Sequence, residues 1–404
     1  MPAFRACGRK AAALASSRPP AHHPVRRPVT VGTLACLAVL SAGVVMLMAL
    51  RAQTLPEVSG RFAVGGMELG LAPGTAAIER EGAATPRVHV WYPLTPDTIA
   101  PEAPRRFPVL LYFPGWPGSA ADNLILVREL ASHGYVVAAA EYPAIPADGA
   151  RAPEPFLDFS SAQGFQDSVR RNDQRVRARA HDAVAILDAL TVRGGSKRDI
   201  LSPSPHLGVL PGAGILGFSL GGAVAAEACR LDRRFAAAVN LDGLHFAAAA
   251  QQGVEQPYLL ISDDSPLPTP AELDAADPGL RYLSALIKAD YEQTVANLER
   301  HGGTFATLAG TRHVNFSDGA SRWRFRRLTE AGSIDPARAH EIIQAYVLAF
   351  FAKYLQGEDS PLLAGNSTRY PEMHLRIWTR AAGRAVPAEP ATAPPRQARE
   401  ARPT

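Results

Sequence analysis

Short apolar runs alternate with longer stretches of helical periodicity over most of the chain. The runs typical of strands lie at 87–94, 107–115, 135–143, 212–219, 235–243, 257–264 and 304–313. Patterns typical of helices lie at 119–134, 174–192, 220–231 and 335–357. This order predicts an α/β fold, in which helices cover both faces of a mostly parallel central sheet.

A longer apolar stretch precedes this region. Residues 29–50 read VTVGTLACLAVLSAGVVMLMAL without one charged side chain, and about 20 apolar residues suffice to cross a bilayer. The segment 29–51 is therefore predicted to be a transmembrane anchor or the hydrophobic region of a cleaved signal, since Ala52 could end a cleavage site. The basic leader 1–28 is expected to stay in the cytoplasm. The body would then lie outside the cytoplasm, either anchored to the membrane or secreted.

No break in the pattern divides residues 55–380 into two cores, so one catalytic α/β domain is predicted there. Its segment 144–172 is rich in Pro, Gly and Ser and is predicted to be a long insertion without regular structure. Residues 381–404 consist largely of Ala, Pro and Arg without periodicity, which predicts a disordered tail.

Charge and cysteine content narrow the function. The formal net charge is +4, but residues 1–28 carry six basic side chains and no acid, which leaves −2 for the remaining chain. A body of this charge gives no electrostatic support for binding nucleic acid. Cys7 and Cys36 precede the body and only Cys229 lies within it, so we expect no disulfide in the body. We also expect no metal site, because metal-ligand spacing is absent. Nothing in the sequence indicates an oligomeric state.

The strand predicted at 212–219 ends in a serine between glycines. The letters GFSLG place Gly217, Ser219 and Gly221 in a G-x-S-x-G motif between a buried strand and a helix. This context is typical of the nucleophile elbow of serine hydrolases. In so tight a turn, the residues two positions before and after the serine must lack side chains. The structural alternative is a glycine-rich helix start packed closely on the sheet.

A serine hydroxyl becomes a nucleophile when a base accepts its proton. In this architecture an acid follows the serine in the chain and a histidine comes last. His313 directly follows the last predicted strand, where a loop can lie over the carboxyl-terminal edge of the sheet, and it is the predicted base. Asp242 ends the strand after the nucleophile helix, and Asp263 and Asp264 end the next strand. Position in the chain alone does not decide which of these acids is the partner of the histidine.

Acyl transfer also needs hydrogen-bond donors for the developing oxyanion. The backbone N–H of Leu220, directly after the serine, is one expected donor. The second should come from the loop PGWPG that follows the strand 107–115. Its two prolines have no N–H, which leaves Gly115 and Trp116 as candidates.

Six blocks of the sequence together resemble a known family. In chain order they read VHVWYP, FPVLLYFPGWPG, GFSLGGAVA, FAAAVNLDG, GTRHVNFSD and GSIDPARAHEIIQAYVLAFFAKYL. They resemble the platelet-activating-factor acetylhydrolase-like group of α/β-hydrolases over roughly residues 60–375. The resemblance implies an α/β-hydrolase fold and a serine carboxylesterase, without a cofactor, whose partner is a small ester or a lipid.

The resemblance also bears on the site. In that family the acid lies in a strand-end motif like LDG, which implies Asp242, with Asp264 as the alternative acid. The resemblance likewise implies that an oxyanion donor lies just after the Pro-Gly of the early loop, and the residue at that position is Trp116. Many members have a histidine before that glycine, where this chain has Pro114.

The resulting hypothesis is hydrolysis of short acyl or phospholipid-type esters through an acyl-enzyme. Ser219 would attack the ester carbonyl, His313 would carry the proton, and Asp242 would orient the imidazolium. A peptidase or acyltransferase with the same triad and a non-catalytic, membrane-anchored protein of hydrolase fold are the alternatives.

Overall fold

The structure is a computed structural model that describes residues 55–71, 86–94, 105–142, 155–191, 207–322 and 331–380. The segments 1–28, 29–51 and 381–404 lie outside the described residues, so the predicted leader, anchor or signal, and tail are not part of this description. Within the ranges that are described, no helix combines the length and apolar character needed to cross a membrane.

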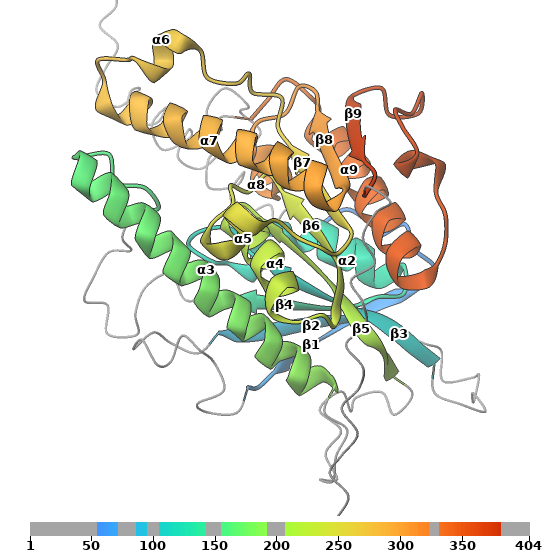
Figure 1. The fold of residues 1–404 in the computed structure, drawn as a ribbon. Helices are drawn as coiled ribbons and strands as arrows, with labels where there is room; N and C mark the ends of the chain where they lie inside the picture. Colours follow the sequence, from blue (N-terminus) through green and yellow to red (C-terminus); the bar gives the residue numbers. More distant parts are fainter. Residues whose placement is uncertain are drawn as a thin grey trace, which may run out of the picture. The chain divides into compact units, whose positions relative to one another are not determined.

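The described strands form one mixed sheet (Figure 1) in the order β1-β2-β4-β3-β5-β6-β7-β8-β9. The strands are β1 Ala63–Leu69, β2 Arg87–Leu94, β3 Arg105–Phe113, β4 Val136–Glu141, β5 Leu207–Phe218, β6 Phe235–Leu241, β7 Tyr258–Ser262, β8 Gly303–Leu308 and β9 Met373–Trp378. The six neighbouring strands in the middle of the sheet pair in parallel, in the order β4, β3, β5, β6, β7 and β8. At the two edges, β1, β2 and β9 make antiparallel pairs. The predicted mostly parallel sheet is confirmed.

Helices cover both faces of this sheet. They are α2 Leu124–Ser132, α3 Ala162–Thr191, α4 Leu220–Leu231, α5 Ala247–Gln252, α6 Pro270–Leu273, α7 Pro278–His301, α8 Gly319–Arg322 and α9 Pro336–Phe351, with the short helices η2 Ala120–Asn123, η3 His313–Phe316, η5 Ala352–Gln356 and η6 Pro361–Leu363. Side chains of α3, α4, α5 and α7 share one buried apolar cluster, and those of α2 and α9 share the other. Leu110 and Leu111, neighbours on β3, point into opposite clusters. Because both faces are covered, the central strands are apolar without alternation.

Two parts of the predicted pattern differ from the structure. The predicted insertion 144–172 does not run as far as expected, because α3 begins at Ala162 and extends the helix predicted from residue 174. The added turns carry mostly polar side chains, most of them half-buried or exposed, and therefore lack an apolar stripe. The Ser161 hydroxyl accepts the Gly164 N–H at their start. The sequence pattern also missed β1, β9 and α7. The edge strand β9 is largely exposed and so has no apolar run to reveal it.

Candidate active site

Ser219 occupies a sharp turn between β5 and α4. Its φ of 55° and ψ of −121° lie outside the usual regions for a residue with a side chain. Its N–H donates to the carbonyl of Leu241 at 2.9 Å, which ties the turn to the end of β6. A Cβ on Gly221 would lie 1.9 Å from the oxygen of Phe113, and one on Gly217 would lie 2.2 Å from the Gly221 carbonyl carbon. Both positions therefore accept only glycine, which is the physical reason for the G-x-S-x-G spacing.

The structure brings His313 between Ser219 and Asp242. His313 begins η3, shortly after β8 ends at the same edge of the sheet as β5 and β6. Its Nε2 lies 3.0 Å from Ser219 Oγ, and its Nδ1 lies 2.7 Å from Asp242 Oδ2. The imidazole also packs on the ring of Phe218, with 4.8 Å between centroids. The three side chains form one hydrogen-bonded series that uses both nitrogens of the histidine.

The carboxylate of Asp242 is held from the side opposite His313. Its Oδ1 accepts the hydroxyl of Ser262 and the N–H of Asp263, both at 2.9 Å. The side chain is only 10% exposed, and the residue has a φ of 55°. These contacts leave Oδ2 directed to the imidazole.

Asp264, the alternative acid, has other partners. Its Oδ2 accepts the N–H of Gly310 at 2.6 Å, and its Oδ1 accepts Nη1 of Arg312 at 2.7 Å. The side chain thus ties the end of β7 to the loop that leads into His313. Of the two candidate acids, the structure brings Asp242 to the imidazole.

The charges around His313 favour its protonated form. Burial lowers the pKa of His313, but the hydrogen bond to Asp242 and the charges of Asp242 and Asp263 outweigh burial and raise that pKa above its ordinary value. The pKa of the Asp263 carboxyl group is raised as well, because burial and the nearby charge of Asp242 disfavour its ionised form. A cationic imidazole is the state that must form when the histidine accepts a proton from serine.

Two backbone N–H groups near Ser219, among the described residues, have no hydrogen-bond acceptor. The N–H of Gly115 donates to Asp122 Oδ2 at 3.0 Å, which removes one of the two candidates in the PGWPG loop. Among the residues that the structure describes, neither Trp116 N–H nor Leu220 N–H has a hydrogen-bond acceptor. The missing Cβ of Gly115 would lie 3.3 Å from Ser219 Cβ, so this loop lies directly beside the serine.

Arginines of α3 hold the PGWPG loop, a role that the sequence pattern did not reveal. Arg179, which is almost completely buried, donates Nη2 to the carbonyl of Pro117 at 3.1 Å. The guanidinium of Arg175 lies 4.1 Å from the centre of the Trp116 ring, and that of Arg179 lies 3.9 Å from the centre of the Tyr142 ring. Such cation–π contacts stabilise the loop. Their only signal in the sequence is an arginine-rich helix, which is more often a solvated face.

A second serine lies beside a histidine and an acid, in a different arrangement. Ser59 Oγ binds Glu129 Oε1 and lies 3.1 Å from Nε2 of His133. The same Nε2 is also 3.1 Å from Glu129 Oε1. A triad needs the acid on one ring nitrogen and the serine on the other. The cluster instead ties the chain before β1 to α2.

No part of the chain that the structure describes groups three or more His, Cys, Asp or Glu side chains in a way that could hold a metal ion. Cys229 is a free, buried thiol on α4, and burial raises its pKa. A thiol in that state is a poor nucleophile and metal ligand.

Comparison with known proteins adds three findings. A family model described as platelet-activating factor acetylhydrolase, isoform II, matches residues 98–361, a range that includes Trp116, Ser219, Asp242 and His313. A curated protein of Arthroderma benhamiae, named as a probable 1-alkyl-2-acetylglycerophosphocholine esterase, is 25% identical over 292 residues, which cover 66% of this chain and 65% of that protein. The chain therefore spans somewhat less than two thirds of that relative. The solved ferulic acid esterase from Streptomyces cinnamoneus has a similar fold, with a TM-score of 0.57 and 24% identity over 80% of this chain and 98% of its own.

Proposed function

We propose, from the premise that this chain belongs to the platelet-activating factor acetylhydrolase isoform II family, that it is a serine hydrolase of carboxylic esters. The observation that carries the proposal is the series Ser219–His313–Asp242, in which each ring nitrogen of the histidine has its own partner. Two unpaired backbone N–H groups beside the serine support the same chemistry.

The proposed reaction has two halves. Ser219 Oγ attacks the ester carbonyl carbon while Nε2 of His313 takes the hydroxyl proton. The N–H groups of Leu220 and Trp116 bind the resulting oxyanion, and Asp242 stabilises the imidazolium. His313 then gives the proton to the departing alcohol oxygen, which leaves an acyl-enzyme. In the second half, water attacks the acyl-enzyme carbonyl carbon while His313 takes a proton from it. His313 then gives this proton to Ser219 Oγ, so that the carboxylic acid leaves and Ser219 is free again.

The substrate class proposed is a short acyl ester, including acyl esters of phospholipids. The family and the name of the Arthroderma benhamiae relative favour this class. A position of the catalytic domain outside the cytoplasm, anchored through residues 29–51 or secreted, is proposed from the sequence of residues 1–51 alone. No cofactor is proposed.

Labelling with a fluorophosphonate tests the nucleophile. The full chain is expected to form one covalent adduct per molecule at Ser219, and preincubation with the probe should abolish hydrolysis of p-nitrophenyl acetate. Peptide mass spectrometry locates the adduct. A Ser59→Ala variant, which lacks the other serine beside a histidine and an acid, should label like the wild type. An unlabelled Ser219 in a folded protein would contradict the proposal.

The raised pKa of His313 predicts the pH dependence of hydrolysis. The base must be neutral to accept the serine proton, so kcat/KM should fall as the pH drops through the pKa of His313. Because Asp242 raises that pKa above the ordinary value of 6.5, the acid limb should have its midpoint above 6.5. Initial rates on p-nitrophenyl acetate from pH 5 to 9 measure it, after subtraction of the spontaneous hydrolysis. An acid limb centred below 6.5 would contradict the electrostatic account.

A further inference from the structure

A second histidine and carboxylate lie buried next to the site, and the proposed reaction uses neither. The side chains of His245 and Asp290 are 7% and 14% exposed. Nδ1 of His245 lies 3.1 Å from Asp290 Oδ1, and the same oxygen accepts the backbone N–H of His245 at 2.8 Å. His245 lies three residues after Asp242, in the loop between β6 and α5, whereas Asp290 lies on α7. A buried charge of this kind costs free energy unless it is paired.

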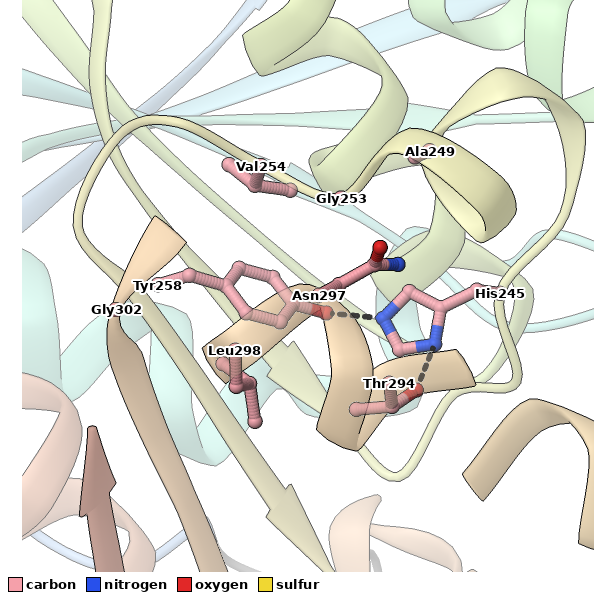
Figure 2. A pocket seen from close by; sticks show the side chains of 9 residues that line it. All are labelled: His245, Ala249, Gly253, Val254, Tyr258, Thr294, Asn297, Leu298 and Gly302. Carbon is pink, nitrogen blue, oxygen red and sulfur yellow. Dashed lines mark hydrogen bonds between the residues drawn. The ribbon is translucent and has the colours of Figure 1, made fainter. Parts of the chain in front are cut away.

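From His245 a chain of hydrogen bonds leads towards the nucleophile turn. Nε2 of His245 lies 2.7 Å from the hydroxyl of Tyr258, and that hydroxyl lies 3.0 Å from Nδ2 of Asn240. Figure 2 shows the Tyr258 hydroxyl directed at one ring nitrogen of His245 and the Thr294 hydroxyl directed at the other. The imidazole is therefore fixed at both nitrogens.

The chain ends on the backbone beside the proposed catalytic residues. The completely buried amide of Asn240 accepts the N–H of Gly243 at 2.8 Å and donates to the Gly243 carbonyl at 2.9 Å. Gly243 directly follows Asp242. A Cβ on Gly243 would lie only 2.1 Å from the carbonyl oxygen of Ser219. Asn240 thus presses the backbone after Asp242 against the backbone of Ser219.

In this series of hydrogen bonds, each group can act as donor to one neighbour and as acceptor to the next. Nδ1 of His245 lies within hydrogen-bond distance of Asp290 Oδ1 and of the Thr294 hydroxyl, and both oxygens can accept its proton. Nε2 is then the acceptor for the hydroxyl of Tyr258. Burial raises the pKa of Tyr258, which keeps that hydroxyl protonated. The oxygen of Tyr258 remains free to accept the Asn240 amide.

Little solvent can replace these contacts. A pocket of about 10 Å³ lies between His245, Tyr258 and Leu298 (Figure 2), which is near the lower limit for one water molecule. The loss of one member of the chain would therefore leave its neighbours unpaired instead of solvated.

We propose that His245, acting through Tyr258 and Asn240, is a positioning residue that holds the Asp242 loop against the Ser219 turn. The inference rests on the proposed function, because it assigns His245 a role in aligning the proposed triad. His245 does not touch the reacting atoms. Its effect reaches them through the two hydrogen bonds between Asn240 and Gly243, which we call the Gly243 clamp. The position of the imidazole in turn depends on Asp290.

Tyr258→Phe removes one hydroxyl from the middle of the chain and keeps the ring. The Gly243 clamp should loosen, so the Asp242–His313 hydrogen bond should lengthen. We expect kcat on p-nitrophenyl acetate to fall about tenfold with KM within about twofold, since misplacement of a reacting group costs rate and not uniform binding. His245→Leu should behave similarly, and His245→Gln, whose amide oxygen can accept the Tyr258 hydroxyl, should restore part of the rate.

The pKa of His313 separates positioning from simple stabilisation. It is measured by NMR titration of the full chain with ¹³C-labelled histidine, and the signal is assigned from its loss in His313→Gln. In Tyr258→Phe the pKa should move down from its raised value, because the contact with Asp242 that raises it is weakened. Rates are expressed per active site after fluorophosphonate titration, so that unfolded molecules do not count.

Leu298→Ala is the matched control. It enlarges the same pocket and destabilises the fold, but it removes no polar group of the chain. Its rate per active site and its His313 pKa should equal those of the wild type. An unchanged His313 pKa in Tyr258→Phe, or an equal shift in Leu298→Ala, would overturn the inference. If the wild type hydrolyses no ester and Tyr258→Phe still lowers the pKa of His313, the proposed function fails while the positioning role stands.

Discussion

Ser219→Ala is expected to lower kcat for ester hydrolysis by roughly 10⁶-fold, the loss found when the nucleophile of a serine protease is removed. Without Oγ, no atom at this turn can form the acyl-enzyme, and His313 has no hydroxyl proton to accept. The residual rate would reflect only binding and the two oxyanion donors.

The same substitution should leave the fold intact. The only hydrogen bond that the Ser219 hydroxyl makes among the described residues is the one to His313, and alanine accommodates the turn as serine does. We expect the free energy of unfolding to change by less than about 1 kcal/mol. Circular dichroism and a denaturant titration check this, with p-nitrophenyl acetate hydrolysis measured on the same preparation. Ser59→Ala is the control, expected to retain the wild-type rate. Turnover by a folded Ser219→Ala variant above about 1% of wild type would refute the assignment of the nucleophile.

Asp242→Asn is expected to lower kcat by roughly 10³- to 10⁴-fold while the backbone stays in place. Asparagine can still accept the Ser262 hydroxyl and the Asp263 N–H through its carbonyl oxygen. Its NH₂ group would then face Nδ1 of His313 and require that nitrogen to act as an acceptor. The proton would move to Nε2, where the imidazole could no longer accept the proton of Ser219.

Asp264→Asn is the matched control for this experiment. It removes one carboxylate from the adjacent strand end and weakens the contact with Arg312, which is half-exposed. Contacts of this kind contribute little, so the loss in kcat should stay below about tenfold. Rates per active site at pH 8 compare the two variants. A larger loss in Asp264→Asn than in Asp242→Asn would identify Asp264 as the acid.

Local sequence predicted the strand–turn–helix at Ser219 because its constraints act within a few residues. Gly217 and Gly221 face one another and the end of β3 across one turn, so the motif itself carries the geometry. The parallel core strands were equally visible, since a strand covered on both faces must be apolar throughout. His313 followed from its place after the last of these strands.

The elements that the pattern missed lack this local signature. The first turns of α3 carry mostly polar side chains, and three of the six residues of the edge strand β9 are exposed. Neither element has a continuous apolar run like those of the central strands. The sequence therefore predicted the central strands and their helices better than the edge strand β9 and the first turns of α3.

The choice among chemically equal groups depended on contacts between distant segments. Asp242 and Asp264 both end strands, but Arg312 and Gly310 engage Asp264 and leave Asp242 to His313. In the same way, Asp122 accepts the N–H of Gly115, whereas the N–H of Trp116 has no acceptor among the described residues.

The sequence by itself determined a parallel α/β core, a serine on a glycine-flanked turn and a histidine after the last parallel strand. Only the tertiary structure shows that Asp242, and not Asp264, contacts His313, and that the Gly115 N–H is already paired with Asp122. It alone assembles His245, Asp290 and Tyr258, where the histidine meets partners 45 and 13 residues away. The reason is physical. The sterics of a turn and the burial of a strand depend on residues close together in the sequence, whereas these hydrogen bonds join residues that only the tertiary fold brings together.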